Sequence, residues 1–152
     1  MEIQLTVKRS EVLHRVARMT NYTGAKREGD ENAYDRISTV DEDDDELKLF
    51  WDEMRGELVN ILAGKIVSEG LRDDNDTYDL VLSVYDGFNT ALIAGMTINL
   101  FYYFVYGILA KWYIYTNEQS VDDYAAMSAV QIDELSSYLV QRVFERDMFF
   151  KC

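Results

Sequence analysis

The sequence lacks proline altogether and contains one cysteine and one histidine in 152 residues. Average proline usage of about 5 per cent would give roughly seven, so their absence favours long helices joined by few tight turns. The only cysteine, Cys152, excludes an intramolecular disulfide and a CxxC metal site, and favours a reducing, cytosolic setting. Residues 1–12 lack the continuous apolar core of a signal peptide, so we expect the protein to stay in the cytoplasm that makes it.

Positive charge is also scarce. Fifteen Lys and Arg stand against 28 Asp and Glu, a net charge of -13. That balance disfavours nonspecific binding to nucleic acid or anionic lipid, because both require neutralisation of phosphate by Lys and Arg. Apolar residues make up 48% of the chain, which argues against disorder, and its length fits one core. We therefore expect a single domain, 1–152, with an acidic surface.

The hydrophobic pattern predicts a mainly α fold, a bundle of about four helices with a small two-stranded β element at residues 2–7 and 78–84. Both strand segments alternate polar and apolar residues, and we expect them to pair with each other or with strands of neighbouring copies. Residues 24–40 read as a loop with one helical turn at "AYDRI". Helical spacing recurs in four stretches. The first runs from about Ser10 to Gly24, the second from the acidic run to near Gly64 or Gly70, and the third covers residues 87–110. The last helix begins at Ser120, which with Asp123 forms a capping-box-like start.

Residues 87–110 contain no charged residue, and 24 uncharged positions reach the length of a membrane span. Asn89, Thr97, Asn99 and the tyrosines of "FYYFVY" oppose that interpretation, as does the lack of a flanking basic cluster. We favour a helix buried by its own chain or by neighbouring copies, and we expect no membrane partner.

Six consecutive acidic residues, 41–46, precede an apolar helical stretch. A calcium loop starting at Asp41 fails, because its sixth position is Glu46 where a glycine must turn the chain. We instead expect Asp41 to cap a helix whose first turn places acids against the positive end of the dipole. Capping needs fewer acids than this, so we expect Asp43, Asp44 and Asp45 to face solvent.

Helical carboxylates also suggest an alternative, a small magnesium-dependent all-α nucleotide pyrophosphohydrolase. Glu46, Glu53 and Glu57 supply carboxylates on one helix, and Glu53 and Glu57 share a face. A second helix with acids turned inward is lacking, because the acids of the last helix fit its outer side: Asp122, Asp123, Asp133 and Glu134.

Other catalytic patterns are absent from the sequence. His14 lies beside the apolar stripe of the first helix, and we interpret it as a structural residue. No Ser or Cys near it has a motif that would activate it as a nucleophile. The nucleotide-binding motifs GxGxxG and GxxxxGK[ST] do not occur. We expect no catalytic residue, no cofactor and no metal ion. The aromatic residues Tyr102, Tyr103, Trp112, Tyr113 and Tyr115 lack neighbouring basic residues for a nucleic-acid platform, which favours a packed core or a subunit interface.

Two blocks of sequence resemble a known family. "VDEDDDELKLFWDEMRGELVNIL" is similar to the acidic-start helix of head-to-tail connector (adaptor) proteins of tailed bacteriophages, and "INLFYYFVYGILAKWYIYTNEQS" is similar to their later long helix. The motifs "NYTGAK", "YDRI" and "ILAKWY" resemble proteins in phage-like gene clusters of gut Bacteroidales. The chain departs from the pattern in its N-terminal strand and in being longer than many connectors.

The resemblance implies a noncatalytic virion protein of the phage neck, a homo-oligomeric ring, commonly of twelve copies. It would join the portal protein to the next connector or tail protein and let double-stranded DNA pass without specific binding. Residues 145–152 would be a C-terminal docking tail, with Met148, Phe149, Phe150 and Lys151 at the portal. Asp43, Asp44 and Asp45 would line the channel or its rim, where negative charge repels DNA. A helical protein-binding module of unknown partner stays open as a further alternative.

Overall fold

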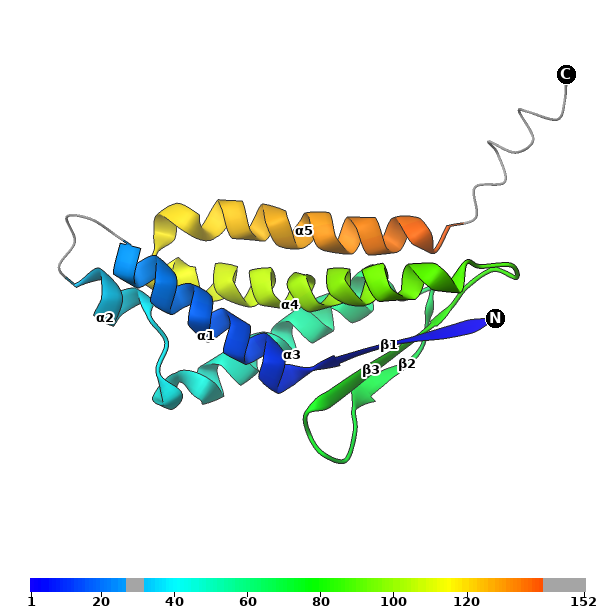
Figure 1. Cartoon of the computed structure of the whole chain (residues 1–152), viewed down its shortest axis with the longest axis horizontal. Coiled ribbons are helices and arrows are strands. Elements are labelled where there is room, and N and C mark those ends of the chain that lie inside the picture. The colour runs from blue at the N-terminus through cyan, green and yellow to red at the C-terminus, as the bar shows by residue number, and fades with distance from the viewer. Residues whose placement is uncertain (27–31, 141–152) are drawn as a thin grey trace, which may run out of the picture.

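The computed structural model describes residues 1–26 and 32–140 as a layer of helices over one face of a small sheet (Figure 1). The predicted class, mainly α with a small β element, is confirmed. The helices are α1 (Arg9–Lys26), α2 (Ala33–Ile37), α3 (Asp44–Ile61), α4 (Ile93–Thr116) and α5 (Val121–Tyr138), and the strands are β1 (Glu2–Lys8), β2 (Ile66–Leu71) and β3 (Thr77–Ser83). Short 3-10 turns precede three of the helices: η1 (Asp41–Asp43), η2 (Thr90–Leu92) and η3 (Glu118–Ser120).

The sheet has three antiparallel strands in the order β1-β3-β2. β1 and β3 pair within the chain as expected, with Leu5 opposite Leu80. The third strand, β2, follows closely after α3, so the helix ends at Ile61 and not at Gly64 or Gly70. Periodicity did not reveal β2 because "IVSEGL" lacks alternation and its pairing with β3 shifts register between Ile66 and Ser68.

Helix α4 lies at the centre of the fold, in contact with β1, α1, α2, α3 and α5. Its inner face carries Phe104, which stacks on Trp51 of α3 with ring centroids 3.9 Å apart. Tyr78 of β3 meets both rings edge-on. These three buried side chains join helix layer to sheet, and burial of this kind explains why the segment carries almost no charge.

Gly107 leaves room for Met54 between α3 and α4. A Cβ added to Gly107 would overlap the thioether end of Met54, so a larger residue here would require the Met54 side chain to move. Nearby, the Tyr103 hydroxyl donates to the backbone oxygen of Met54 at 2.9 Å. The two helices are thus joined by packing and by a buried hydrogen bond.

The segment Thr90–Thr116, which comprises η2 and α4, is long and apolar enough to cross a membrane by length and composition alone. Within the described residues it is the one helix that meets this test. Half of its most apolar 18-residue window is buried inside the fold. Several of the other residues are partly buried against the core, and the large hydrophobic side chains of α4 that are exposed are Ile98, Ile114 and Tyr115.

Two expected helix caps are wrong. Asp41 does not cap α3, because residues 41–43 form a 3-10 turn in which Asp43 Oδ2 accepts a hydrogen bond from the backbone N–H of Val40 at 2.8 Å. Ser120 precedes α5, but its side chain makes no cap; its Oγ accepts from the side-chain amide of Asn117 at 2.9 Å. In each case a local side-chain bond replaces the expected one.

Candidate functional site

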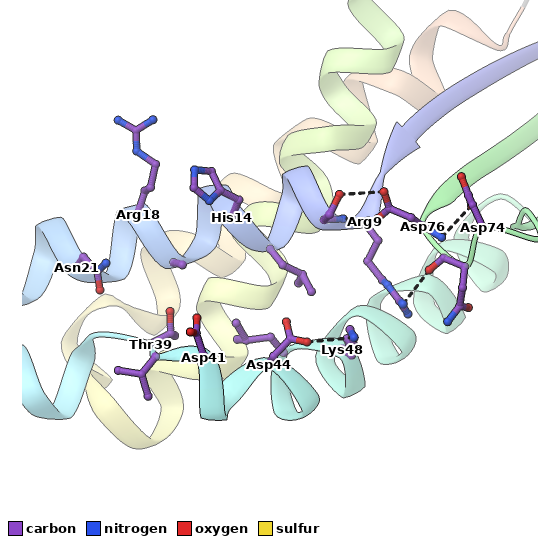
Figure 2. A pocket seen from close by; sticks show the side chains of 16 residues that line it. Arg9, His14, Arg18, Asn21, Thr39, Asp41, Asp44, Lys48, Asp74 and Asp76 are labelled. Atoms are coloured by element: carbon purple, nitrogen blue, oxygen red, sulfur yellow. Dashed lines mark hydrogen bonds and ion pairs between the residues drawn. The ribbon is translucent and has the colours of Figure 1, made fainter.

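Helix α1 borders two grooves. The first groove lies between α1, the start of α3 and the β2–β3 turn, and has a volume of about 840 Å³ (Figure 2). Its lining includes residues of both signs: Arg9, Arg18 and Lys48, and Asp41, Asp44, Asp74 and Asp76. Figure 2 shows His14 and Arg18 at the rim, with their side chains pointing away from Asp41 and Asp44.

One end of the first groove is fastened to the β2–β3 turn by hydrogen bonds. Arg9 Nη2 donates to the backbone oxygen of Asn75 at 2.8 Å. The carboxylate of Asp76 accepts from the backbone N–H of Ser10 at 2.7 Å and from its hydroxyl at 2.9 Å. These charges hold the start of α1 to the sheet, so they are already used by the fold.

Asp74 organises the turn itself. It accepts hydrogen bonds from the Thr77 hydroxyl, the Thr77 N–H and the Asp76 N–H. These bonds, led by the Thr77 hydroxyl, lower the pKa of Asp74 to about 2 because they stabilise its ionised form. Asn75 at the tip adopts a left-handed backbone with φ 59°, a conformation that Asn tolerates well.

The other end of the first groove is open. His14 and Arg18 are exposed and make no hydrogen bond or ion pair with any residue in the described part of the chain. Asp44 pairs with Lys48 one turn along α3 at 3.0 Å. His14 is therefore a surface residue, and the expectation that it is structural, beside the apolar stripe, is wrong.

The second groove, which we call the α1–α4 groove, lies between α1 and α4 and adjoins the first groove at Ser10, His14 and Arg18. Three adjoining hollows of about 220, 480 and 430 Å³ share lining residues and run from the end of β1 to α5. Phe101, Tyr102 and Tyr124 line the groove, and Tyr106 connects them in a ladder of rings whose successive centroids are 5.2, 5.3 and 6.0 Å apart. Helix α1 contributes eight lining residues: Ser10, Glu11, His14, Arg15, Arg18, Met19, Tyr22 and Thr23.

Arg15 is the most unusual residue of the α1–α4 groove. Its Nε atom is buried and makes no hydrogen bond within residues 1–26 and 32–140. Burial raises the pKa of the Tyr106 hydroxyl, with a smaller contribution from Tyr102, and the nearby Arg15 guanidinium opposes that rise. A buried donor without an acceptor is costly, and the exposed guanidinium of Arg18 one turn along α1 adds a second positive charge at this part of the groove.

The acidic residues predicted to face solvent lie at the start of α3. Asp44 and Asp45 are exposed, whereas Asp43 is half-buried because its carboxylate is bound to Val40. Glu42, Asp45 and Glu46 make no hydrogen bond or ion pair inside the described ranges. The predicted docking residues Met148, Phe149, Phe150 and Lys151 lie outside the described residues, as does the whole tail 145–152.

The carboxylates considered for a magnesium enzyme are engaged differently. Lys111 of α4 reaches Glu53 at 3.3 Å and Glu57 at 3.4 Å. Glu53 and Glu57 do share a face of α3, but both carboxylates on that face bind Lys111 of the same chain. In the described part of the chain, no three His, Cys, Asp or Glu side chains are grouped so as to hold a metal ion.

The aromatic residues divide between core and surface. Tyr103 and Tyr113 are buried, in agreement with the core interpretation, and the Trp112 indole donates to the backbone oxygen of Ile37 at 2.6 Å. Tyr115 is 82% exposed at the end of α4. Sequence reasoning missed the α1–α4 groove; the grouping of His14, Arg15 and Arg18 in an acidic chain is the signal that could have indicated it.

Comparison with family models, curated proteins and solved structures found no match to this chain.

Proposed function

We propose that this protein is a noncatalytic structural component of a tailed-phage particle, a head-to-tail connector that forms a homo-oligomeric ring between portal and tail. The resemblance in the acidic-start helix and the long apolar helix supports this assignment. The physical observation that carries it is the incomplete covering of α4 by the described residues of its own chain.

Apolar side chains of α4 reach the surface at both ends of the helix. Ile98 is 58% exposed near its start, and Ile114 is 51% exposed beside Tyr115 near its end. Each square ångström of apolar surface removed from water contributes about 25 cal/mol. Packing against further copies in a closed ring would cover these residues in a chain whose other surfaces are strongly acidic.

Helix α5 supports the same proposal. It packs on α4 along its length at the edge of the molecule, and Met127 and Val130 are exposed on its other sides (Figure 1). The net charge of -13 suits a ring whose channel passes DNA without retaining it. Neighbouring copies, the portal and a tail protein are the partners of this model.

The proposal is tested by the mass of the assembled protein. Light scattering of the purified chain, alone and mixed with the portal protein of the same phage, should detect a ring or a portal-bound complex. Ile98→Ser combined with Ile114→Ser should abolish that assembly. Val67→Ser is the matched control, because Val67 is 50% exposed on β2 and should leave assembly unchanged.

Two outcomes would overturn the proposal. A monomer that ignores the portal at all accessible concentrations would exclude a connector. Magnesium-dependent hydrolysis of nucleoside triphosphates by the same preparation would identify the enzyme alternative instead.

A further inference from the structure

We propose that the α1–α4 groove of one copy binds the acidic turn, residues 40–46, of the next copy. This inference rests on the proposed function and names the contact that would hold adjacent copies of the ring together.

The groove is a receptor suited to carboxylates. Arg15 and Arg18 both line it and make it positively charged, and Arg18 is exposed with no partner among the described residues. The ring ladder beside them supplies the hydroxyls of Tyr102, Tyr106 and Tyr124, which donate hydrogen bonds to acids. Glu11 is the only acid along the groove's lining within residues 1–26 and 32–140.

The acidic turn is the matching ligand. It concentrates six acids in a row, and Glu42, Asp45 and Glu46 are exposed and have no partner among the residues that the structure describes. Val40, at its start, is 59% exposed and supplies an apolar contact for the aromatic floor of the groove. Charge-assisted bonds to Arg are about twice as strong as neutral ones, and Arg binds a carboxylate through two parallel bonds.

Within one chain the acidic turn does not occupy the groove. Asp41 and Asp44 line the first groove, Arg15 and Tyr124 line only the α1–α4 groove, and Arg18, which lines both, makes no ion pair with either acid. In Figure 1 the start of α3 lies at the opposite edge of the molecule from α5. A contact between different patches on successive copies is heterologous, and it closes into a ring when the rotation between copies allows it.

Charge reversal separates this contact from nonspecific effects. We expect Arg15→Glu with Arg18→Glu to lower the assembled fraction at least tenfold in light scattering, and Glu42→Lys with Asp45→Lys to do the same. A one-to-one mixture of the two variants should recover assembly, because each mixed interface again joins opposite charges. Asp122→Lys with Asp133→Lys, two exposed acids of α5, changes the charge equally and should have no effect.

Separate control experiments test whether the variants fold. Because Arg15 is half-buried, His14→Glu with Arg18→Glu repeats the reversal with exposed residues only, and circular dichroism should match the original protein for every variant. Where the original chain assembles only with portal, all variants are compared with portal present.

The outcomes distinguish the two proposals. Assembly of the original chain that survives both groove reversals, or reversals that the mixture does not rescue, would overturn this contact and leave the connector intact. Failure of the original chain to assemble, with or without portal, would overturn both.

Discussion

Two regions of the molecule use charged residues in opposite ways. At the sheet, Arg55 of α3 donates to Glu69 of β2 at 2.7 and 3.0 Å, and the Tyr78 hydroxyl donates to the same carboxylate at 2.8 Å. Along the α1–α4 groove and the acidic turn, Arg18 and Asp45 have no partner among the described residues. Paired charges fix the fold, whereas unpaired charges of the same residue types are available to another molecule.

The sheet region also shows how charges are paired across the strands. Arg72, just after β2, binds Asp79 of β3 through both carboxylate oxygens, and the same carboxylate accepts from the hydroxyl of Thr6 on β1 at 2.7 Å and from Gln4. Asp79 of β3 therefore binds side chains of β1 and of Arg72, the residue that follows β2, and its pKa is lowered chiefly by the bond from Arg72. We expect a substitution of Asp79 to lower the stability of the fold.

Glu69→Gln should produce the largest difference in stability between a substitution in the sheet region and one in the acidic turn. The change weakens the bonds from Arg55 and removes a charge that Tyr78 also contacts, in a partly buried position. We expect a loss of about 1–3 kcal/mol in the free energy of unfolding, measured by urea denaturation. The matched change Glu42→Gln in the acidic turn should stay within about 0.5 kcal/mol. Equal losses of stability from the two changes would show that the paired and unpaired acids do not differ in their importance to the fold.

Acid should act on the sheet region through Asp74, Glu69 and Asp79. The pKa of each is lower in the folded than in the unfolded chain, so their stabilisation is present above about pH 4 and is lost as the pH falls, for Asp74 toward about 2. Asp74→Asn should therefore be less stable than the original at pH 6, and the difference should shrink by about pH 2.5. A constant difference across this range, in thermal melts, would show that the charge of Asp74 does not matter.

The smallest effect should come from replacing Asp43, Asp44 and Asp45 together with asparagine. An asparagine side chain in place of Asp43 keeps an oxygen that accepts from the Val40 N–H, and the loss of the Asp44–Lys48 pair on an exposed helix is offset by weaker repulsion. We expect a melting temperature within a few degrees of the original. A large drop would mean that the acidic turn serves the fold and not a partner.

Periodicity predicted the elements of the fold that repeat over many residues. The spacing predicted one apolar stripe on α3, and all of its members except Ile61 are buried: Leu47, Phe50, Trp51, Met54, Leu58 and Leu62. Strand β2 was not predicted, because it is an irregular edge strand whose pattern depends on pairing with β3. The two helix caps were predicted wrongly, since Asp43 and Asn117 offered closer hydrogen-bonding alternatives.

The functional surface was less predictable than the core. The acidic run was visible in the sequence, and its unpaired acids lie on the surface. The α1–α4 groove was not visible, because Arg15 and Tyr106 are 91 positions apart and meet only through the packing of α1 on α4. A local pattern cannot report a surface made by two distant helices.

The stack of Trp51 on Phe104 also gives the chain a built-in optical probe. Trp51 is fully buried where α3, α4 and β3 meet, whereas Trp112 is half-buried and bound to the carbonyl of Ile37. A Trp112→Phe variant would carry a single indole, whose emission shifts to longer wavelength only when water enters the core. Its spectrum would separate loosening of the interior from events at the surface, without any added dye.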